Sequence, residues 1–295
     1  MAASSKVRKA VLPVAGFGTR VLPGTKVVAK ELLNVVDRPI LSYIVAEARA
    51  AGIEHFVFVT GRGKGAIEDY FDHQVELEAS LEAKGKTAIL QELRAELPRP
   101  GEMSFVRQMQ PLGLGHAVWC ARDVVGDEPF AVLLPDMIMH AARPALAQLT
   151  DAYGRTGGNL ILVEPVPEAE VHKYGVVAPD PAKPRDGAVL PINGMVEKPP
   201  VGTAPSNLYV NGRYILQPEI FGLLADQTAG AGGEIQLTDA MARLMGSQPF
   251  HAVELDGTTY DCGDKIGLLR ANVALALARP DLGAQAREAI EALLR

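Results

Sequence analysis

Cysteine is scarce in this chain of 295 residues, and it shows none of the spacings that bind metals or build a disulfide framework. Cys120 and Cys262 are the two cysteines, and no Cys-x-x-Cys pair is present. The six histidines are scattered, without His-x-x-x-His spacing. This composition argues against a zinc site and favours a protein of the reducing cytoplasm.

The sequence also lacks an excess of basic residues and a long apolar run. Lys plus Arg number 29 and Asp plus Glu number 35, so the formal charge of −6 is opposite to that of a typical duplex-binding protein. The longest apolar runs, 130–135 and 273–278, fall far below the ~18 residues of a membrane helix. Residues 1–9 have no apolar core of a secretory signal. We therefore expect a soluble protein without nucleic-acid or membrane partners, in which a local basic pocket can still bind small phosphorylated ligands.

Hydrophobic residues make up 48% of the chain and charged residues 22%, close to the average of soluble globular proteins. This balance excludes intrinsic disorder and fibrous repeats, and it supplies a large core. The length fits one large domain or two ordinary ones. Because no repeat or low-complexity linker divides the chain, we expect one continuous α/β body with an inserted β-rich part.

The first half alternates short apolar runs with helical patterns. Runs of strand length occupy 9–14, 55–60, 103–107 and 130–134, and helical spacing occupies 39–51, 66–71 and 114–122. This alternation indicates parallel strands joined by helical crossovers in an open sheet. The charged segment 74–96 is rich in helix formers and is broken at Gly85, which predicts a solvated helical hairpin suited also to a subunit contact.

The second half is richer in strands. The strand candidates are 159–166, 174–178, 189–197, 208–216, 250–255 and 258–261, and the helix candidates are 234–245, 264–278 and 282–294. The turn cluster 179–187 suits a hairpin between its flanking strands. Asp256-Gly257 is a strong two-residue hairpin signal and predicts that 250–255 pairs with 258–261. Asp264 directly precedes a helical pattern and is predicted to cap that helix.

A glycine-rich loop, 12–23, follows the first strand. Gly16 and Gly18 let the backbone approach a ligand closely, and successive N–H groups there can cradle phosphate oxygens. Arg20 adds a planar donor fork for phosphate. The loop is not a dinucleotide fingerprint, because Val21 stands where the third glycine belongs, and it lacks the Gly-Lys-Ser/Thr of a Walker loop. The similar segment Gly61-Arg-Gly-Lys-Gly65 is better explained as a turn that begins a helix.

A series of collinear segments from about residue 7 to residue 278 resembles the sugar-1-phosphate nucleotidylyltransferases. The segments are Ala15-Gly16-x-Gly18-Thr19-Arg20-x-Leu22-Pro23, Lys26, Lys30-Glu31-Leu32-Leu33, Gln108 with Gly113–Ala117, Leu134-Pro135-Asp136, Tyr174-Gly175-Val176, Val196-Glu197-Lys198-Pro199, Gly232–Asp239 and Tyr260-Asp261-Cys262-Gly263. Gln108 with Gly113–Ala117, together with Gly232–Asp239, is similar to the uridylyl branch of that family. Ala29 and Asn34 depart from it, since the family usually has proline at both positions, and they loosen the backbone that presents Lys30.

The resemblance implies a Rossmann-like open mixed sheet flanked by helices, of the nucleotide-diphospho-sugar transferase type, with an inserted β-rich sugar-binding part. It implies one nucleotidyltransferase domain over 1–295, with a nucleotide-binding half at about 7–155, a sugar-binding half at 156–263 and C-terminal helices at 264–295. A cytoplasmic homo-oligomer, either a dimer or a tetramer, is expected.

The implied reaction joins UTP and glucose-1-phosphate to give UDP-glucose and pyrophosphate. A phosphate monoester has its second pKa near 6, so the attacking oxygen is already ionised at neutral pH and needs no protein base. Catalysis then requires alignment of two anions and neutralisation of charge by Mg²⁺ and basic side chains. None of the Ser, Cys or His positions forms a recognisable nucleophile motif, in agreement with this chemistry.

The resemblance also assigns individual roles. By resemblance, Arg20, Lys30 and Lys198 are catalytic, and the nucleotide contacts come from Ala15, Gly16, Gly18, Thr19, Arg20, Lys30, Gln108 and Gly113. The sugar contacts come from Gly175, Glu197 and Lys198, and the metal ligands are Asp136 and Asp261. Gln108 suits a base edge, because its carboxamide offers one donor and one acceptor. Glu197 and Lys198 are neighbours whose side chains point apart in a regular strand, so both reach one sugar phosphate only at a bulge or a strand end.

Two alternatives stay open on the sequence alone. A thymidylyltransferase acting on glucose-1-phosphate shares the glycine loop and the Glu-Lys pair. A non-catalytic regulatory paralogue is suggested by Ala29 and Asn34, although Arg20, Asp136 and Lys198 are all present. A dinucleotide-dependent reductase is excluded by the spacing of the glycines.

Overall fold

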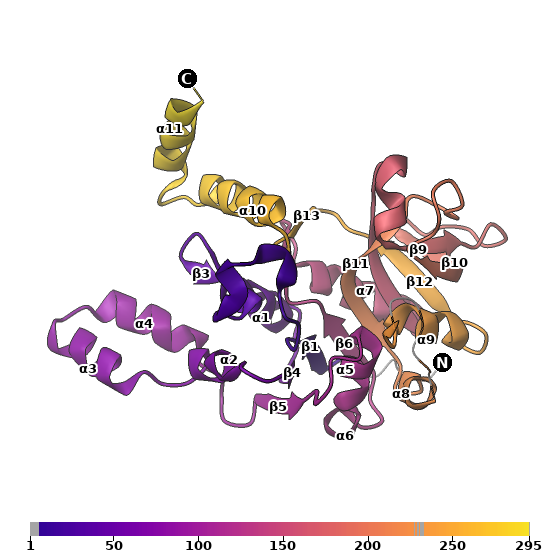
Figure 1. Ribbon diagram of the computed structural model, residues 1–295, viewed down its shortest axis with the longest axis horizontal. Coiled ribbons are helices and arrows are strands. Elements are labelled where there is room, and N and C mark those ends of the chain that lie inside the picture. The colour runs from indigo at the N-terminus through magenta and orange to yellow at the C-terminus, as the bar shows by residue number, and fades with distance from the viewer. Residues whose placement is uncertain (1–5, 227, 229, 231–232, 295) are drawn as a thin grey trace.

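The computed structural model describes residues 6–226, 228, 230 and 233–294, and one mixed sheet forms its centre (Figure 1). Within this described part the sheet has nine strands. Their order in space is β5 (Met103–Arg107), β4 (His55–Thr60), β1 (Lys9–Pro13), β6 (Phe130–Leu133), β11 (Leu208–Leu216), β8 (Asn159–Pro165), β12 (Phe250–Glu254), β10 (Val189–Glu197) and β9 (Gly175–Pro179).

The sheet changes character at its middle. Strands β5, β4, β1 and β6 run parallel, as the helical crossovers of the first half predict. Strand β11 then pairs antiparallel with both β6 and β8, while β8 and β12 are parallel. The strands of the second half therefore extend the same sheet instead of building a separate one. Ligand crevices in open α/β sheets lie at the carboxyl ends of the strands, so a site is expected at the carboxyl ends of the parallel strands β5, β4, β1 and β6.

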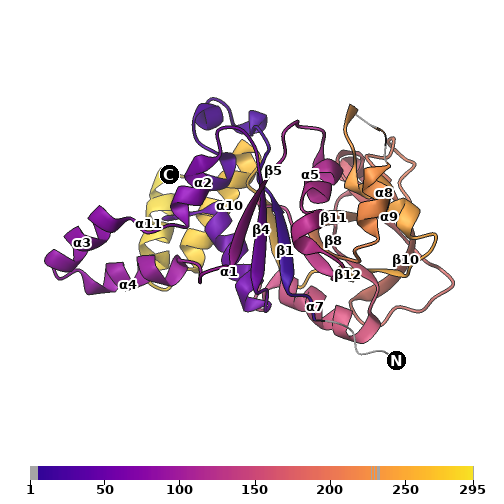
Figure 2. The same cartoon turned by 90° about the horizontal axis from the view of Figure 1, so that it is seen from below.

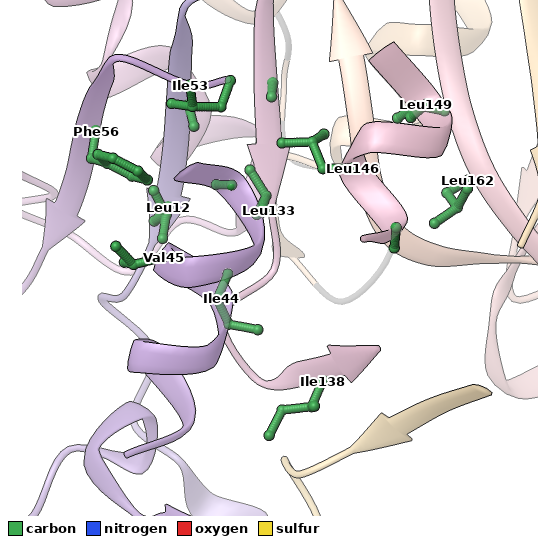
Figure 3. Packing of buried hydrophobic residues seen from close by; sticks show 14 of the residues in the cluster. Leu12, Ile44, Val45, Ile53, Phe56, Leu133, Ile138, Leu146, Leu149 and Leu162 are labelled. Atoms are coloured by element: carbon green, nitrogen blue, oxygen red, sulfur yellow. The ribbon is translucent and has the colours of Figure 1, made fainter. Parts of the chain in front are cut away.

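Helices cover both faces of the sheet, which explains why β1 is buried on both sides. Leu12 of β1 packs in a core formed with α1 (Ile40–Ala50), α2 (Gly65–Tyr70), α7 (Ala145–Thr156) and α10 (Lys265–Ala278). Figure 3 shows Leu12, Ile44 and Val45 in this layer. Val11 packs in a second core with α5 (Leu114–Cys120), α6 (Arg122–Val125), α8 (Ile220–Ala225) and α9 (Leu237–Leu244). Figure 2 places α5, α8 and α9 on one side of the strands and α1 and α10 on the other.

Two helical segments project from this body (Figure 1). The predicted hairpin is present as α3 (Val75–Ala83) and α4 (Thr87–Glu96), with Gly85 between them at a φ of +65°. The last helix, α11 (Gly283–Leu293), has no buried residue and contacts α10. In the described part of the chain, none of the helices combines the length and the apolar character needed to cross a membrane.

The hairpin predicted at Asp256-Gly257 is wrong. Strand β12 pairs with β10 and β8 in the main sheet, whereas β13 (Thr258–Asp261) pairs antiparallel with β7 (Met137–His140) in a small second sheet. Gly257 serves close packing, because a Cβ there would lie 2.7 Å from the Cβ of Ala141. The hairpin predicted across 179–187 is confirmed, since β9 and β10 pair antiparallel.

One long helix and several short elements were not predicted. Helix α7 follows Pro144, and its buried Leu146, Leu149 and Tyr153 have helical spacing. Strands β2 (Asn34–Val35) and β3 (Arg38–Pro39) pair with each other, and four 3₁₀ helices, counted over the described residues, are η1 (Thr19–Val21), η2 (Gly24–Lys26), η3 (Lys30–Leu32) and η4 (Glu168–Lys173). The predicted helix 114–122 ends at Cys120, and α6 begins at Arg122.

The predicted cap of α10 is confirmed. The Asp264 carboxylate accepts hydrogen bonds from the backbone N–H groups of Ile266 at 2.9 Å and Gly267 at 2.8 Å. These N–H groups have no partner inside the helix, so the side chain satisfies two donors of the first turn.

We expect Asp264→Ala to lower the free energy of unfolding by about 0.5–2 kcal/mol, because both capping bonds are lost. Asp264→Asn is the matched control, since asparagine caps about as well as aspartate. Thermal unfolding of the two variants beside the original chain measures the difference. Equal melting temperatures for Asp264→Ala and the original chain would show that the cap does not stabilise α10.

Candidate active site

Three segments singled out in the sequence follow neighbouring parallel strands. The glycine loop follows β1, Leu134-Pro135-Asp136 follows β6, and Gln108 follows β5. The backbone N–H of Gln108 donates to the carbonyl of Thr60 at the end of β4, at 2.8 Å. Because the carboxyl ends of parallel strands share one edge, these segments line the same edge of the sheet.

The glycine loop folds tightly around the Lys30 side chain. A Cβ on Gly16 would lie 3.5 Å from Lys30 Cε. Gly18 has a φ of +67°, and a Cβ there would lie 3.0 Å from Lys30 Cβ. The Thr25 hydroxyl donates to the carbonyl of Gly18 at 2.7 Å and closes the loop. Gly18 is therefore required for the loop and the lysine to pack this closely, whereas the space at Gly16 would accept a Cβ.

Four of the predicted site residues form one charged cluster. Lys30 Nζ lies 2.5 Å from Asp136 Oδ2, and Arg20 Nη1 lies 3.1 Å from Asp261 Oδ2. Arg20 Nη2 also lies 3.9 Å from Asp136 Oδ2. Strand β7 pairs with β13 so that Met137 faces Asp261, and the N–H of Cys262 donates to the carbonyl of Asp136 at 2.8 Å. The small sheet thus holds the two carboxylates beside each other.

The carboxylates converge above Gly263. A Cβ on this residue would lie 2.8 Å from both Asp136 Oδ2 and Asp261 Oδ1, and it would collide with the Arg20 guanidinium. Over the described residues, no group of three or more His, Cys, Asp or Glu side chains is placed to hold a metal ion. Mg²⁺ is usually bound by one or two carboxylates together with phosphates and water, so a convergent pair of carboxylates fits it.

The pKa values of the two carboxyl groups move in opposite directions. Burial raises the pKa of Asp136, but the Lys30 ammonium and the Arg20 guanidinium more than offset this and hold it below the usual value. Burial and the Asp136 charge raise the pKa of Asp261 above its usual value. Burial lowers the pKa of Lys30, while Asp136 and Glu31 outweigh burial and raise it. A charged cluster with such opposed shifts is typical of functional sites.

Cys262 lies between Asp261, a candidate metal ligand, and Gly263, but its thiol is unreactive. Burial, together with the charges of Asp136 and Asp261, raises the pKa of its thiol to about 12. The thiol is therefore protonated at neutral pH, and a protonated thiol is a poor nucleophile and a poor metal ligand.

Gln108 is held by both hydrogens of its amide. Its Nε2 donates to the carbonyl of Gly113 at 3.0 Å and lies 3.0 Å from His116 Nδ1. The carbonyl of Gly113 accepts only, so it fixes which end of the carboxamide is the NH₂ group. Burial lowers the pKa of His116, which favours the neutral ring that accepts this bond. The Oε1 atom of Gln108 is the end that faces away from these partners, so the side chain offers an acceptor.

Gly113 is required for the packing of two predicted motifs on each other. It has a φ of +102°, and a Cβ there would lie 2.7 Å from the Cβ of Glu234. The N–H of Ile235 donates to the carbonyl of Leu112 at 2.7 Å, and the N–H of Gly115 donates to the carbonyl of Ile235 at 2.8 Å. The segment Gly113–Ala117 thus packs against the motif at 233–239, of which Gly232 lies outside the described residues.

The predicted sugar-binding residues meet at the β9–β10 ladder. Glu197 pairs with Gly175, and a Cβ on Gly175 would lie 2.9 Å from Glu197 Oε2. Strand β10 ends at Glu197, and Lys198 follows with a φ of +47°. This strand end brings Lys198 Nζ to 3.9 Å from Glu197 Oε1, as the use of both side chains requires. Thr238 Oγ1 donates to Glu197 Oε2 at 2.9 Å.

A cavity of about 630 Å³ connects the charged cluster with the region before β9. Its lining includes Arg20 and Asp261, and also Tyr174, which directly precedes Gly175. The rings of Tyr174 and Tyr209 pack with their centroids 4.7 Å apart. The cavity therefore adjoins Arg20 and Asp261 of the charged cluster and the residue that precedes β9.

The loop Gly61–Gly65 has its lysine engaged elsewhere. Lys64 Nζ lies 2.7 Å from Glu31 Oε2, and both side chains are buried. A Cβ on Gly61 would lie 3.3 Å from the carbonyl oxygen of Ala15, so this loop packs closely against the glycine loop. Its role as a turn that begins helix α2 agrees with the sequence interpretation.

No binding or catalytic role was assigned from the sequence to three residues that complete these contacts: His116, which was expected only to pack or to form hydrogen bonds, Thr238 and Gly263. All three lie inside segments of the resemblance, yet a lone histidine, hydroxyl or glycine carries no pattern of its own. Their importance becomes visible only through the partners that the fold brings to them.

Comparisons with known proteins give one consistent answer. The family model described as "Nucleotidyl transferase" matches residues 9–277. The UTP–glucose-1-phosphate uridylyltransferase of Bacillus subtilis is 48% identical over 289 residues, which cover 98% of each chain.

Solved structures agree with these matches. UDP-glucose pyrophosphorylase from Acinetobacter baumannii is 45% identical with a TM-score of 0.90, and covers 97% of this chain and 99% of its own. The UTP-bound form from Acinetobacter baumannii is 45% identical with a TM-score of 0.89, and covers 96% and 98%. The match over nearly the whole length, in both sequence and structure, shows that the chain belongs to the nucleotidyl transferase family.

Proposed function

We propose that this protein is a UTP–glucose-1-phosphate uridylyltransferase, which forms UDP-glucose and pyrophosphate from UTP and glucose-1-phosphate. The observation that carries the proposal is the convergence of Asp136, Asp261, Arg20 and Lys30 around Gly263. A transfer between two phosphate-bearing substrates needs negative charge to be neutralised at one point, and this cluster supplies both kinds of group for it.

On the nucleotide side, Arg20 and Lys30 bind the triphosphate, and the glycine loop with Ala15, Gly16, Gly18 and Thr19 lines it. Asp136 and Asp261 would hold Mg²⁺, which offsets charge on the phosphates when it is bound. The same two carboxylates are paired with Arg20 and Lys30. These cations are therefore positioned to move from the carboxylates to phosphate oxygens.

For the sugar phosphate, Glu197 and Lys198 bind different parts of the substrate. The Glu197 carboxylate, fixed by Thr238, accepts hydrogen bonds from glucose hydroxyls, while the exposed Lys198 ammonium pairs with the sugar phosphate. Gly175 lets the Glu197 carboxylate lie against the backbone of β9, since a Cβ there would lie 2.9 Å from Glu197 Oε2. The attacking phosphate oxygen is ionised at neutral pH, so these residues bind and orient it and no residue has to remove a proton.

The acceptor presented by Gln108 suits the base of UTP. Uracil carries a ring N–H between two carbonyls, and this N–H donates to an acceptor such as Oε1 of Gln108. Cytosine has a bare ring nitrogen at the same position, and two acceptors would then face each other. Thymine shares the N–H, so Gln108 does not separate uracil from thymine.

A non-catalytic paralogue is less well supported, because the cluster is intact despite Ala29 and Asn34. Ala29 precedes η3, and Lys30 still reaches Asp136. The assignment of 7–155 to the nucleotide and 156–263 to the sugar is part of the proposal. The homo-oligomer and the cytoplasmic location stay predictions from the sequence.

The first test is pyrophosphate release with glucose-1-phosphate and each nucleoside triphosphate. We expect UTP to be used best, and CTP to be used roughly 5- to 150-fold less well, as the cost of about 1–3 kcal/mol for an unpaired acceptor implies. Rates with dTTP that match those with UTP would favour the thymidylyl alternative. No pyrophosphate from any pair of substrates would contradict the enzyme assignment.

Two variants locate the base contact in the same experiment. Gln108→Ala should raise the KM for UTP and reduce the preference for UTP over CTP. Gln110→Ala is the matched control, since Gln110 is an exposed glutamine two residues away and should leave both values unchanged. An unchanged preference in Gln108→Ala would mean that another residue reads the base.

The second test concerns the metal carboxylate. Asp136→Asn keeps the size of the side chain but removes its charge, so turnover should fall at least about 100-fold while the fold persists. Steady-state rates over a range of Mg²⁺ concentrations, with circular dichroism as a check of folding, measure both effects. Asp264→Asn is the control, being the same substitution on the cap of α10 close by. Near-original turnover in Asp136→Asn, or full turnover in excess chelator, would contradict the metal site.

A further inference from the structure

Arg213 is a fully buried charged residue in the middle of the sheet. It lies in β11, and its exposed fraction is 0%. Its neighbours in the same strand, Tyr214, Ile215 and Leu216, are apolar or aromatic residues of the core. Burial of a guanidinium is costly unless its donors are paired, so the partners of Arg213 need an explanation.

The partner of the charge is Glu47 of α1. Arg213 Nε and Nη2 donate to the two Glu47 carboxylate oxygens at 2.9 Å and 2.7 Å. Glu47 Oε1 also accepts from the N–H of Leu146 in the first turn of α7, at 3.0 Å. This two-armed ion pair fixes the plane of the guanidinium and ties together α1, α7 and β11.

The remaining donors of Arg213 bind the turn that carries Asp136. Arg213 Nη1 donates to the carbonyl of Leu134 at 3.2 Å, and Nη2 donates to the carbonyl of Met137 at 2.8 Å. These two carbonyls lie on either side of Pro135 and Asp136 in the sequence. The N–H of Leu134 donates to the carbonyl of Gly212 at 2.9 Å, so the turn is held by β11 from several directions.

The same turn also determines where Asp261 lies. Met137 begins β7, and it faces Asp261 across the small sheet. The N–H of Cys262 donates to the carbonyl of Asp136. A displacement of the turn at 134–137 would therefore move both carboxylates at once.

We propose that Arg213, held by Glu47, is a positioning residue that fixes the positions of the two metal carboxylates, Asp136 and Asp261, relative to each other. The proposal rests on the function proposed above, because it assigns the carboxylates to a metal. Arg213 does not touch the substrates; it acts on the backbone that presents Asp136. Outer partners of metal ligands typically change metal affinity or activity by about 10–100-fold when they are removed.

The test variant is Arg213→Lys, which keeps the charge opposite Glu47 but loses the planar fork that reaches Leu134 and Met137. Hydrogen exchange followed by mass spectrometry should show faster exchange, by about tenfold or more, in peptides that span 133–140. Calorimetric titration of Mg²⁺ into protein saturated with UDP-glucose should show an affinity about tenfold weaker. High Mg²⁺ should restore most of the lost turnover, since the carboxylates are still present.

Arg49→Lys is the matched control. Arg49 also forms a two-armed pair, with Glu102, and donates to a backbone carbonyl, that of Glu96. Glu102 precedes the first residue of β5, at the opposite end of that strand from Gln108. We expect this variant to lose stability but to keep the Mg²⁺ affinity and the exchange at 133–140.

The outcomes separate this proposal from the proposed function. Unchanged exchange at 133–140 and unchanged Mg²⁺ affinity in a folded Arg213→Lys protein would overturn the positioning role, as would equal effects in Arg49→Lys. If Arg213→Lys does not fold, Glu47→Asp, which shortens the carboxylate arm, should produce the same changes at smaller size, and their absence would overturn the role. Failure of the original chain to form UDP-glucose would overturn the function alone, because the exchange measurement needs no substrate.

Discussion

The arrangement of this protein depends on the mutual repulsion of two carboxylates. Asp136 and Asp261 converge on one point above Gly263, where two negative charges repel each other strongly unless cations lie nearby. Arg20 and Lys30 supply these cations. The same four groups suit the proposed reaction between phosphates, because the carboxylates would hold a metal and the two cations would bind phosphate oxygens. The same ion pairs therefore keep two cations and two carboxylates together at one point.

The fold supplies this cluster from segments that are far apart in the sequence. The glycine loop and the Asp136 turn follow β1 and β6, which are adjacent parallel strands. Asp261 ends β13, and the pairing of β13 with β7 brings it to the same place. On the sugar side, the end of β10 turns Lys198 to the same side as Glu197. Each contribution requires a local departure from regular structure, such as Gly18, Gly113 or Lys198 at positive φ.

The parts of the fold that depend on neighbouring residues in the sequence could be predicted. Apolar runs located the strands, the cluster at 179–187 predicted the β9–β10 hairpin, and the Asp264 cap could be read from its position before a helical pattern. Asp256-Gly257 failed because the partners of β12 and β13 are strands distant in the sequence. The role of Arg213 could not be predicted, since its partner Glu47 is 166 residues away and an arginine in an apolar strand shows no pattern. The resemblance to a known family supplied the candidate site residues, and the structure supplies their contacts.

We propose, as the central claim, that Asp136 and Asp261 would together hold one divalent cation, which would leave Arg20 and Lys30 for the phosphates. Anomalous diffraction from crystals grown with Mn²⁺ and UDP-glucose tests it most directly, because manganese replaces magnesium and its position is measured independently of the protein atoms. We predict one strong peak within coordination distance of both carboxylates and of a phosphate oxygen, with Lys30 moved from Asp136 towards the nucleotide. A peak that lies away from either carboxylate, or a Lys30 still paired with Asp136 in the complex, would contradict the account.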